Sequence, residues 1–374
     1  EIVMQTNKKI VFALLPLSFF LLVGELSSHV FGLTECSAIV PDAGDWETMR
    51  GDPDLLWRLE PNTEFRTNQD VTRINSIGLR ESLLPSQKKR RGEKRIIVTG
   101  DSSIYGWGVR DNETYAVQLE RELRRRFSVP IEVINLGVPG YSTEQTIRLL
   151  DDVGWLYEPD LIIVSNLFSD CNIDAFQDRV ALRLTNPKPT GLEILFQKSR
   201  LYCACYMSWA NYQANLNQNP NRVLMPGIPT GANAAVTLEN LNNTLALSRV
   251  PIEDYLENLN TIKTKAVDKK ALMMLAPLAQ EWDVGIWNVP MPEPTPEHVL
   301  PWFPYRTAQK KWAEQNDIPR VDFSEVFAQY KGPKKSLFID NMHPSVQGTK
   351  LMANAVANYI MQNPEVLQMS KGHR

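Results

Sequence analysis

Cysteine and histidine are both scarce in this chain, which has four of each among its 374 residues. The cysteines are Cys36, Cys171, Cys203 and Cys205, with no C-x-x-C pair and no cysteine–histidine spacing typical of zinc sites. The sequence therefore predicts no metal site and no cofactor. It allows one or two disulfides at most, and a bridge between Cys203 and Cys205 is sterically awkward. We expect the cysteines to be free, small hydrophobic side chains.

A large excess of charge is also absent. The formal net charge is −3 at pH 7, so the composition gives no reason to expect a nucleic-acid partner. The run "KKRRGEKR" from Lys88 to Arg95 is locally basic, and we interpret it as a solvated linker before a strand. With 43% hydrophobic residues and nine Trp, the chain can bury one large core or two modest ones. Nothing in the sequence fixes an oligomeric state.

One long uncharged apolar run is present, from Ile10 to Gly24, directly after Lys8 and Lys9. It is short for a helix that spans a membrane, which needs about 20 residues, unless the segment continues to Leu33. A cleaved signal peptide and an uncleaved signal anchor both fit residues 1–40. The following "ELSSHVFG" is a poor cleavage site, which favours the anchor. Either interpretation keeps the lysines in the cytoplasm and exports the rest of the chain, with the membrane as a partner of the N-terminal helix.

The remainder divides into an N-terminal extension and a larger domain. Residues 41–94 are rich in turns and charge, and "LLWRLEPN" and "RINSIGLRE" are expected to form short strands. From residue 95, apolar β-branched runs alternate with amphipathic helical patterns, which predicts an α/β fold with a parallel sheet covered on both faces. The expected strands are Arg95–Thr99, Glu132–Asn135, Leu161–Ser165, Leu272–Leu275 and Arg320–Asp322. A long insertion at about 171–250 interrupts the pattern, and we interpret it as a cap or lid.

Two serines follow the first expected strand, in Thr99-Gly100-Asp101-Ser102-Ser103. This position is the edge where doubly wound folds place their active sites. A phosphate-binding loop does not fit, because no G-K-[ST] follows and no helix is expected to begin directly at the serines. A nucleophilic serine is the alternative, and it needs a base that takes its proton.

The four histidines leave few choices for that base. His29 lies in the apolar segment and His373 is the second-last residue, which leaves His298 and His343. His343 has the better surroundings, because Asp340 stands three residues before it in a loop that precedes a helix. An acid at that offset can hold the imidazole so that its other nitrogen faces the serine.

Four segments together resemble the blocks of the SGNH (GDSL) hydrolase family, over about Arg95 to Ile360. They are Gly100-Asp101-Ser102, Gly140 in "NLGVPGYST", the segment near Ser169-Asp170 in "SNLFSDCN", and Asp340-x-x-His343. The resemblance implies a flavodoxin-like three-layer α/β/α domain over residues 95–365, a Ser-His-Asp triad without metal, and ester hydrolysis or acyl transfer. The N-terminal apolar segment and the extension look like those of the exported bacterial branch.

The third block departs from the family pattern. The asparagine of the family falls at Ser169 and the glycine at Leu167, so the side-chain amide is replaced by a hydroxyl, which donates one hydrogen bond. Asn166 and Asn172 lie nearby, and either is an alternative donor. The substitution affects the expected rate more than the expected reaction.

These observations predict a serine esterase in which Ser102 is the nucleophile, His343 the general base and acid, and Asp340 the orienting carboxylate. The Ser102 N–H, Gly140 and Ser169 would stabilise the oxyanion. The expected substrate is an O-acyl ester, such as an O-acetyl group, of a cell-surface carbohydrate or lipid, with the catalytic domain anchored outside the cytoplasm. The alternatives are an O-acyltransferase with the same triad, and a non-catalytic carbohydrate-binding module.

Overall fold

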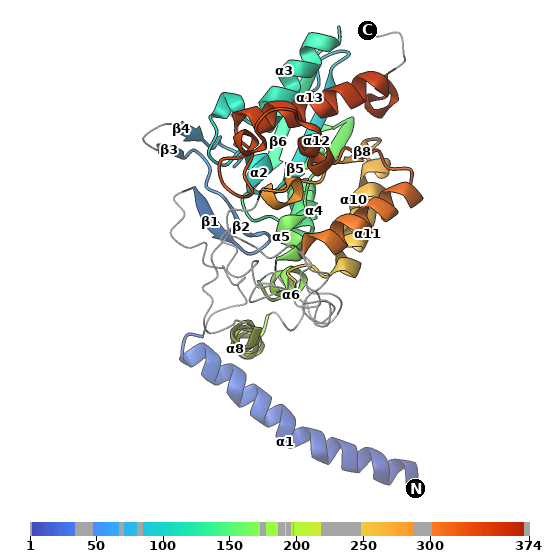
Figure 1. Ribbon diagram of the computed structural model, residues 1–374. Coiled ribbons are helices and arrows are strands. Elements are labelled where there is room, and N and C mark those ends of the chain that lie inside the picture. The colour runs from blue at the N-terminus through green and yellow to red at the C-terminus, as the bar shows by residue number, and fades with distance from the viewer. Residues whose placement is uncertain are drawn as a thin grey trace.

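A four-stranded parallel sheet forms the centre of the molecule (Figure 1). The computed structural model describes residues 2–33, 48–66, 71–80, 85–172, 177–185, 191, 196, 198–217, 248–286 and 301–369. The strands are β5 (Lys94–Gly100), β6 (Ile131–Gly137), β7 (Leu161–Val164) and β8 (Leu272–Leu275), in the order β6-β5-β7-β8. Every residue of β7 is buried, as expected for a sheet that is covered on both faces.

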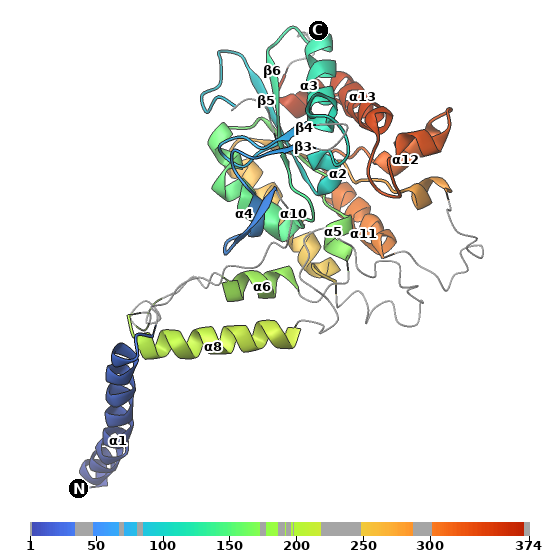
Figure 2. The same cartoon turned by 90° about the vertical axis from the view of Figure 1, so that its left-hand side faces the viewer.

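Helices cover the two faces of this sheet (Figure 2). On one face α3 (Tyr115–Arg126) packs against α13 (Val346–Gln362), and on the other α4 (Thr143–Asp152) packs against α10 (Ile252–Asp268). Helices α11 (Trp302–Gln315) and α12 (Phe323–Gln329) pack against α10 and α13 respectively. The short 3₁₀ helices are η1 (Asp111–Glu113), η2 (Gly154–Tyr157), η3 (Glu281–Val284), η4 (Lys334–Leu337) and η5 (Pro364–Leu367). The predicted α/β fold with a helix-flanked parallel sheet is confirmed.

The fifth strand, expected at Arg320–Asp322, was a wrong prediction. Arg320 forms only an isolated parallel bridge with Leu275. The segment is cut short because the Asp322 carboxylate accepts the Ser324 N–H at 2.8 Å and so caps helix α12. The bridge lies beside β8. When β5, β6, β7, β8 and the bridge are counted 1 to 5 in chain order, their order across the sheet is 2-1-3-4-5, as in flavodoxin-like folds.

Two hairpins make up the described part of the N-terminal extension. Strand β1 (Met49–Asp52) pairs with β2 (Leu56–Leu59), and β3 (Glu64–Arg66) pairs with β4 (Val71–Arg73), both antiparallel. "LLWRLEPN" contains β2, as expected. In "RINSIGLRE" only Arg73 lies in a strand among the residues up to Arg80, because the Asn75 side-chain oxygen accepts the N–H groups of Ile77 and Leu79 and forms a turn. The last residue of that segment lies outside the described residues.

The basic run is exposed at Lys88, Arg90 and Arg91, as expected for a solvated linker, but Arg95 at its end is an exception. Its side chain is fully buried and donates to the carbonyl oxygens of Tyr157 (2.6 Å) and Ser86 (2.7 Å) and to the Glu132 carboxylate (2.6 Å). A buried guanidinium with this many acceptors fixes the start of β5 rather than contacting solvent.

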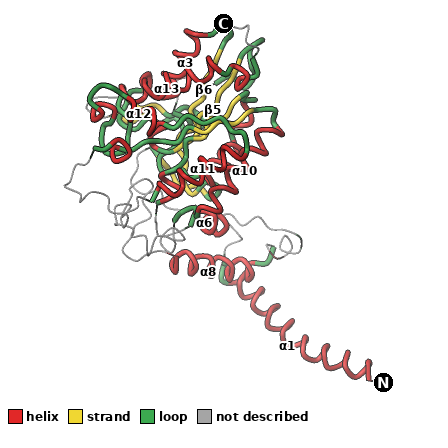
Figure 3. Tube along the Cα trace, turned by 45° about the vertical axis from the view of Figure 1, so that its right-hand side comes forward, coloured by secondary structure: helices red, strands yellow, loops and turns green. Residues whose placement is uncertain are grey.

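The N-terminal helix α1 (Ile2–Val30) and α8 (Arg200–Asn217) lie away from the sheet (Figure 3). They meet at Glu25, whose carboxylate accepts the Ser199 hydroxyl and the backbone N–H groups of Arg200 and Leu201 at 2.6–3.1 Å. These bonds hold the pKa of Glu25 down, at about 2. No helix in the described ranges has the length and apolar character needed to cross a membrane.

The insertion after β7 contributes α5 (Phe168–Cys171), α6 (Asp178–Thr185) and α8. Much of the expected insertion lies outside the described residues, as do His298, His373 and Cys36. Cys171 and Cys205 are free, but Cys203 forms a disulfide, so the expectation of free cysteines was wrong for Cys203. Spacing along a sequence does not reveal which cysteines meet in the fold.

Candidate active site

Ser102 lies in a tight turn at the carboxyl end of β5. Asp101 caps the one-turn helix α2 (Ser102–Tyr105), and its carboxylate accepts the Ser103 N–H at 3.0 Å. A short helix therefore does begin at the serines, contrary to expectation. It sits against the end of β6, where a Cβ on Gly137 would come within 2.3 Å of the Tyr105 nitrogen. Glycine at that position allows the serine-bearing turn to pack directly on the neighbouring strand.

Ser102, His343 and Asp340 form a continuous hydrogen-bonded chain. His343 Nε2 lies 2.8 Å from Ser102 Oγ, and His343 Nδ1 lies 2.7 Å from Asp340 Oδ2. The other carboxylate oxygen of Asp340 accepts the N–H groups of Met342 (2.9 Å) and His343 (2.8 Å). The structure thus brings together the three residues that the sequence proposed as a triad.

The Asp340 carboxylate is held in its ionised form. Burial by itself raises the pKa of Asp340, but the hydrogen bond and charge of His343 and the two backbone N–H groups outweigh it, so the pKa is about 2. A carboxylate that stays charged keeps a proton on His343 Nδ1. Nε2 is then left to accept the hydroxyl proton of Ser102.

Trp107 supports the histidine ring and was not identified from the sequence. Its indole stacks on the His343 imidazole, with ring centroids 5.8 Å apart and an interplanar angle of 28°. The hydroxyl of Ser103, the residue after Ser102, donates to the carbonyl of Met342, the residue before His343, at 3.4 Å. The sequence signal that could have identified Trp107 is its position five residues after Ser102, in "SSIYGWGV".

Two backbone N–H groups near Ser102 are available to a ligand. The N–H groups of Ser102 and Gly140 donate to no acceptor within the ranges that the structure describes. The loop that carries Gly140 lies beside the serine turn, because the Val138 N–H donates to the Gly100 carbonyl at 3.1 Å. Gly140 has φ of +76°, a conformation that favours glycine. The predicted oxyanion donors Ser102 and Gly140 therefore lie on adjacent segments.

Ser169 lies on α5 and contacts Asp101. The Asp101 carboxyl is buried, which raises its pKa, while hydrogen bonds from the Ser103 N–H and the Ser169 hydroxyl lower it. The predicted third donor is thus placed next to the residue that precedes Ser102.

The two alternative amide donors occupy other positions. Asn166 donates to the Tyr141 carbonyl at 3.0 Å and accepts the Thr146 hydroxyl at 3.1 Å. Its side chain therefore connects the Gly140 loop to helix α4. Asn172 uses its backbone to accept the Arg249 N–H at 2.8 Å. In the described residues no three histidine, cysteine or carboxylate side chains are grouped so that they could hold a metal ion.

No family model and no curated protein matches the chain. Its structural neighbours are GDSL lipases and esterases at low sequence identity. A lipase/acylhydrolase from Enterococcus faecalis is 15% identical, with a TM-score of 0.41 over 71% of this chain and 95% of that one. An acetylxylan esterase from Geobacillus stearothermophilus is 14% identical, with a TM-score of 0.41 over 74% and 95%. These values are low, so the case for a function depends on the geometry of the site itself.

Proposed function

We propose that the chain is a serine esterase, with Ser102 as nucleophile, His343 as general base and acid, and Asp340 as the orienting carboxylate. The observation that carries this proposal is the hydrogen-bonded chain from Ser102 Oγ through His343 to Asp340, with distances of 2.8 and 2.7 Å. A serine hydroxyl is a weak nucleophile until an adjacent base accepts its proton, and this geometry supplies the base.

The reaction follows from these contacts. As Ser102 Oγ attacks the ester carbonyl carbon, His343 Nε2 takes the hydroxyl proton and the carbonyl oxygen becomes an oxyanion. The N–H groups of Ser102 and Gly140 donate to that oxygen, and the Ser169 hydroxyl donates to it after turning away from the Asp101 carboxylate. The protonated imidazole then gives its proton to the leaving alkoxide, so the alcohol departs and the acyl group stays on Ser102. His343 then takes a proton from a water molecule as that water attacks the acyl carbon, and the imidazolium returns the proton to Ser102 Oγ as the acid leaves.

The proposed substrate is an O-acyl ester, such as an O-acetyl group, on a cell-surface carbohydrate or lipid. An extracytoplasmic location is part of this proposal, with the N-terminal segment either cleaved as a signal peptide or kept at the membrane by its apolar surface. It is supported by the apolar run after Lys8 and Lys9 and by the disulfide at Cys203, because disulfides persist in oxidising compartments.

The test is hydrolysis of p-nitrophenyl acetate, combined with labelling by a fluorophosphonate probe and peptide mapping. The probe should attach to Ser102, and Ser102→Ala or His343→Ala should abolish turnover. Ser103→Ala is the matched control, because that hydroxyl contacts only a carbonyl at 3.4 Å, and it should retain activity. Labelling at Ser103, or full turnover in both triad variants, would rule the proposal out. Faster release of p-nitrophenol with added alcohol acceptors would indicate acyl transfer in place of hydrolysis.

A further inference from the structure

The loop that carries Gly140 is held by side chains from two segments far from it in sequence. The indole Nε1 of Trp57, on β2 of the N-terminal extension, donates to the Pro139 carbonyl at 3.0 Å. The guanidinium of Arg249, at the end of the long insertion, donates to the Gly140 carbonyl at 2.7 Å. Both peptide groups that flank the Gly140 Cα are therefore fixed by a buried donor.

The Trp57 contact determines where the Gly140 N–H points. The Pro139 carbonyl and the Gly140 N–H belong to one peptide group, and in a trans peptide the two point in opposite directions. The described residues contain no cis peptide bond. A donor that holds the carbonyl on one side therefore holds the N–H on the other. Glycine at φ of +76° would otherwise let this peptide rotate with little steric resistance.

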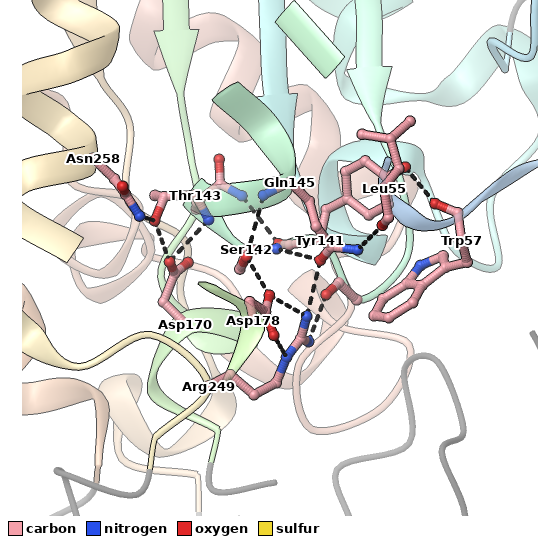
Figure 4. Close-up of polar contacts among 12 residues, drawn as sticks. Leu55, Trp57, Tyr141, Ser142, Thr143, Gln145, Asp170, Asp178, Arg249 and Asn258 are labelled. Carbon is pink, nitrogen blue, oxygen red and sulfur yellow. Dashed lines mark hydrogen bonds and ion pairs between the residues drawn. The ribbon is translucent and has the colours of Figure 1, made fainter. Parts of the chain in front are cut away.

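Arg249 is itself fixed in place (Figure 4). Its guanidinium donates to both carboxylate oxygens of Asp178, at 2.9 and 2.7 Å, and to the Gln145 side-chain oxygen at 2.9 Å. It also lies over the Trp57 ring, 5.3 Å from the centroid. Asp178 in turn accepts the Ser142 hydroxyl at 2.5 Å. Arg249 and Asp178 are both buried, so this is a rigid, water-excluded support for the loop.

We propose that Trp57 and Arg249 are positioning residues that hold the Gly140 N–H toward the reacting carbonyl. The inference rests on the proposed esterase function and adds to it, because it makes the N-terminal extension and the end of the insertion working parts of the active site. A donor that is fixed before the reaction stabilises the oxyanion without reorganisation, whereas a rotating one does not. Loss of either support should therefore lower kcat and leave KM nearly unchanged.

Trp57→Phe is the sharpest variant, because it removes the Nε1–H and keeps an aromatic ring under Arg249. We expect kcat for p-nitrophenyl acetate to fall about tenfold or more, with KM within about twofold. Affinity for a short alkyl boronic acid should fall by the same factor as kcat/KM, since its tetrahedral adduct on Ser102 places an oxygen where the oxyanion forms. The matched control is Trp302→Phe, an equally buried tryptophan whose indole donates to Asp283 at 2.9 Å, and it should change neither quantity.

A second pair of variants tests the Arg249 contact. Arg249→Met combined with Asp178→Asn removes both buried charges together, so that no lone charge stays in the interior. Arg249→Lys keeps the charge but not the planar set of donors, and it should lose less activity than the double variant. Arg179→Met is the control: Arg179 lies on α6 and pairs with Glu144, Asp254 and Glu257 without touching the loop, so its kcat should match the wild type.

The outcomes separate the two proposals. If the wild type neither hydrolyses the ester nor labels at Ser102, the esterase function is wrong. If it does both and folded Trp57→Phe keeps kcat and boronic acid affinity within twofold, only the positioning role is wrong. An equal loss of kcat in Trp57→Phe and Trp302→Phe would also overturn the positioning role. So would an equal loss of kcat in the Arg249 double variant and Arg179→Met. Thermal unfolding of each variant shows whether it is folded. If Trp57→Phe does not fold, Arg249→Lys tests the positioning role in its place.

Discussion

Ser169 carries a single hydroxyl proton where the resembled family has a side-chain amide. We expect Ser169→Ala to lower kcat about 10- to 100-fold with little change in KM, because loss of one oxyanion donor costs roughly 10²–10³ and a rotatable hydroxyl is less preorganised. Steady-state kinetics on p-nitrophenyl acetate would measure this. Ser165→Ala is the control, since the buried Ser165 hydroxyl has no hydrogen-bond partner among the described residues, and the activity of this variant should not change. An unchanged kcat in Ser169→Ala would limit Ser169 to its contact with Asp101.

At the residue scale, the sequence predicted the groups that occur in short, recognisable spacings. Asp340 and His343 are three positions apart, and Ser102 follows a strand-ending glycine, so each has a local pattern. Trp57 and Pro139 are 82 positions apart, and no periodicity relates an indole to a distant carbonyl. Supporting residues of this kind become visible only when the fold brings them together.

At the scale of elements, the helix that carries Ser102 depends on Arg80 from the N-terminal extension. The Arg80 guanidinium is buried and donates to three carbonyl oxygens in and after α2, those of Tyr105, Gly106 and Val109. Arg80→Met should lower the free energy of unfolding by about 3 kcal/mol, because these carbonyls lose their donor in a buried place. Urea unfolding followed by tryptophan fluorescence would measure the change.

Arg73 provides the matched control for Arg80. Both arginines pair with Asp111, at 3.3 Å for Arg80 and 3.4 Å for Arg73, but the Arg73 side chain is 48% exposed. Exposed ion pairs contribute little, so Arg73→Met should change stability by less than about 0.5–1 kcal/mol. Equal losses in the two variants would show that the ion pair, and not the contact with the carbonyls, accounts for the effect.

Asp170 joins helices α5, α4 and α10 through Thr143. One carboxylate oxygen accepts the Thr143 N–H (2.9 Å) and hydroxyl (2.5 Å), and Asn258 donates to that hydroxyl at 2.9 Å. The other carboxylate oxygen has no hydrogen-bond partner in the part of the chain that the structure describes. Burial raises the pKa of Asp170 to about 7, although the bonds from Thr143 oppose it. The folded state therefore binds this proton more tightly than the unfolded chain, where the pKa is about 3.9. The contribution of the Asp170 carboxyl to the free energy of unfolding therefore falls as the pH rises from about 4 to 7.

Asp170→Asn should remove that dependence. Relative to the wild type, the variant should gain about 2–3 kcal/mol of unfolding free energy between pH 5 and pH 8. Chemical unfolding at the two pH values would measure the difference. Asp151→Asn changes an exposed carboxylate on α4, the helix that Asp170 contacts through Thr143, and it should leave the wild-type pH profile unchanged. A constant difference between Asp170→Asn and wild type at both pH values would contradict the assignment.

The elements themselves were predictable where their pattern was uniform. The four strands are continuous apolar runs bounded by turns, and the structure places a strand at each. The segment Arg320–Asp322 has the same apolar centre but ends on a helix cap, and the side chain of Asp322 decided the outcome locally. Three residues are too few for the hydrophobic periodicity to distinguish a strand from the start of a helix.

At the scale of the whole molecule, helix α1 exposes many large apolar side chains. The exposed residues of the described part include Leu15, Phe19, Phe20, Leu22, Leu26, Val30 and Phe31. We expect the full chain, expressed in a bacterial host, to sediment with membranes and to stay there after a carbonate wash, because this surface gains free energy by leaving water. A chain that starts near Pro41 should be soluble. Release of a shortened soluble form would indicate a cleaved signal peptide, and full-length release by carbonate would contradict an anchor.

Ser102 and His343 are separated by 241 positions along the chain. Ribosomes add about 5–20 residues per second, so roughly 12–50 seconds pass between synthesis of the proposed nucleophile and of its proposed base. During that interval the growing polypeptide has a serine that nothing deprotonates. If the proposed function is right, a chain whose synthesis stopped anywhere before His343 should lack triad catalysis. For the proposed esterase, the order of the residues along the chain therefore sets the earliest time at which hydrolysis can begin.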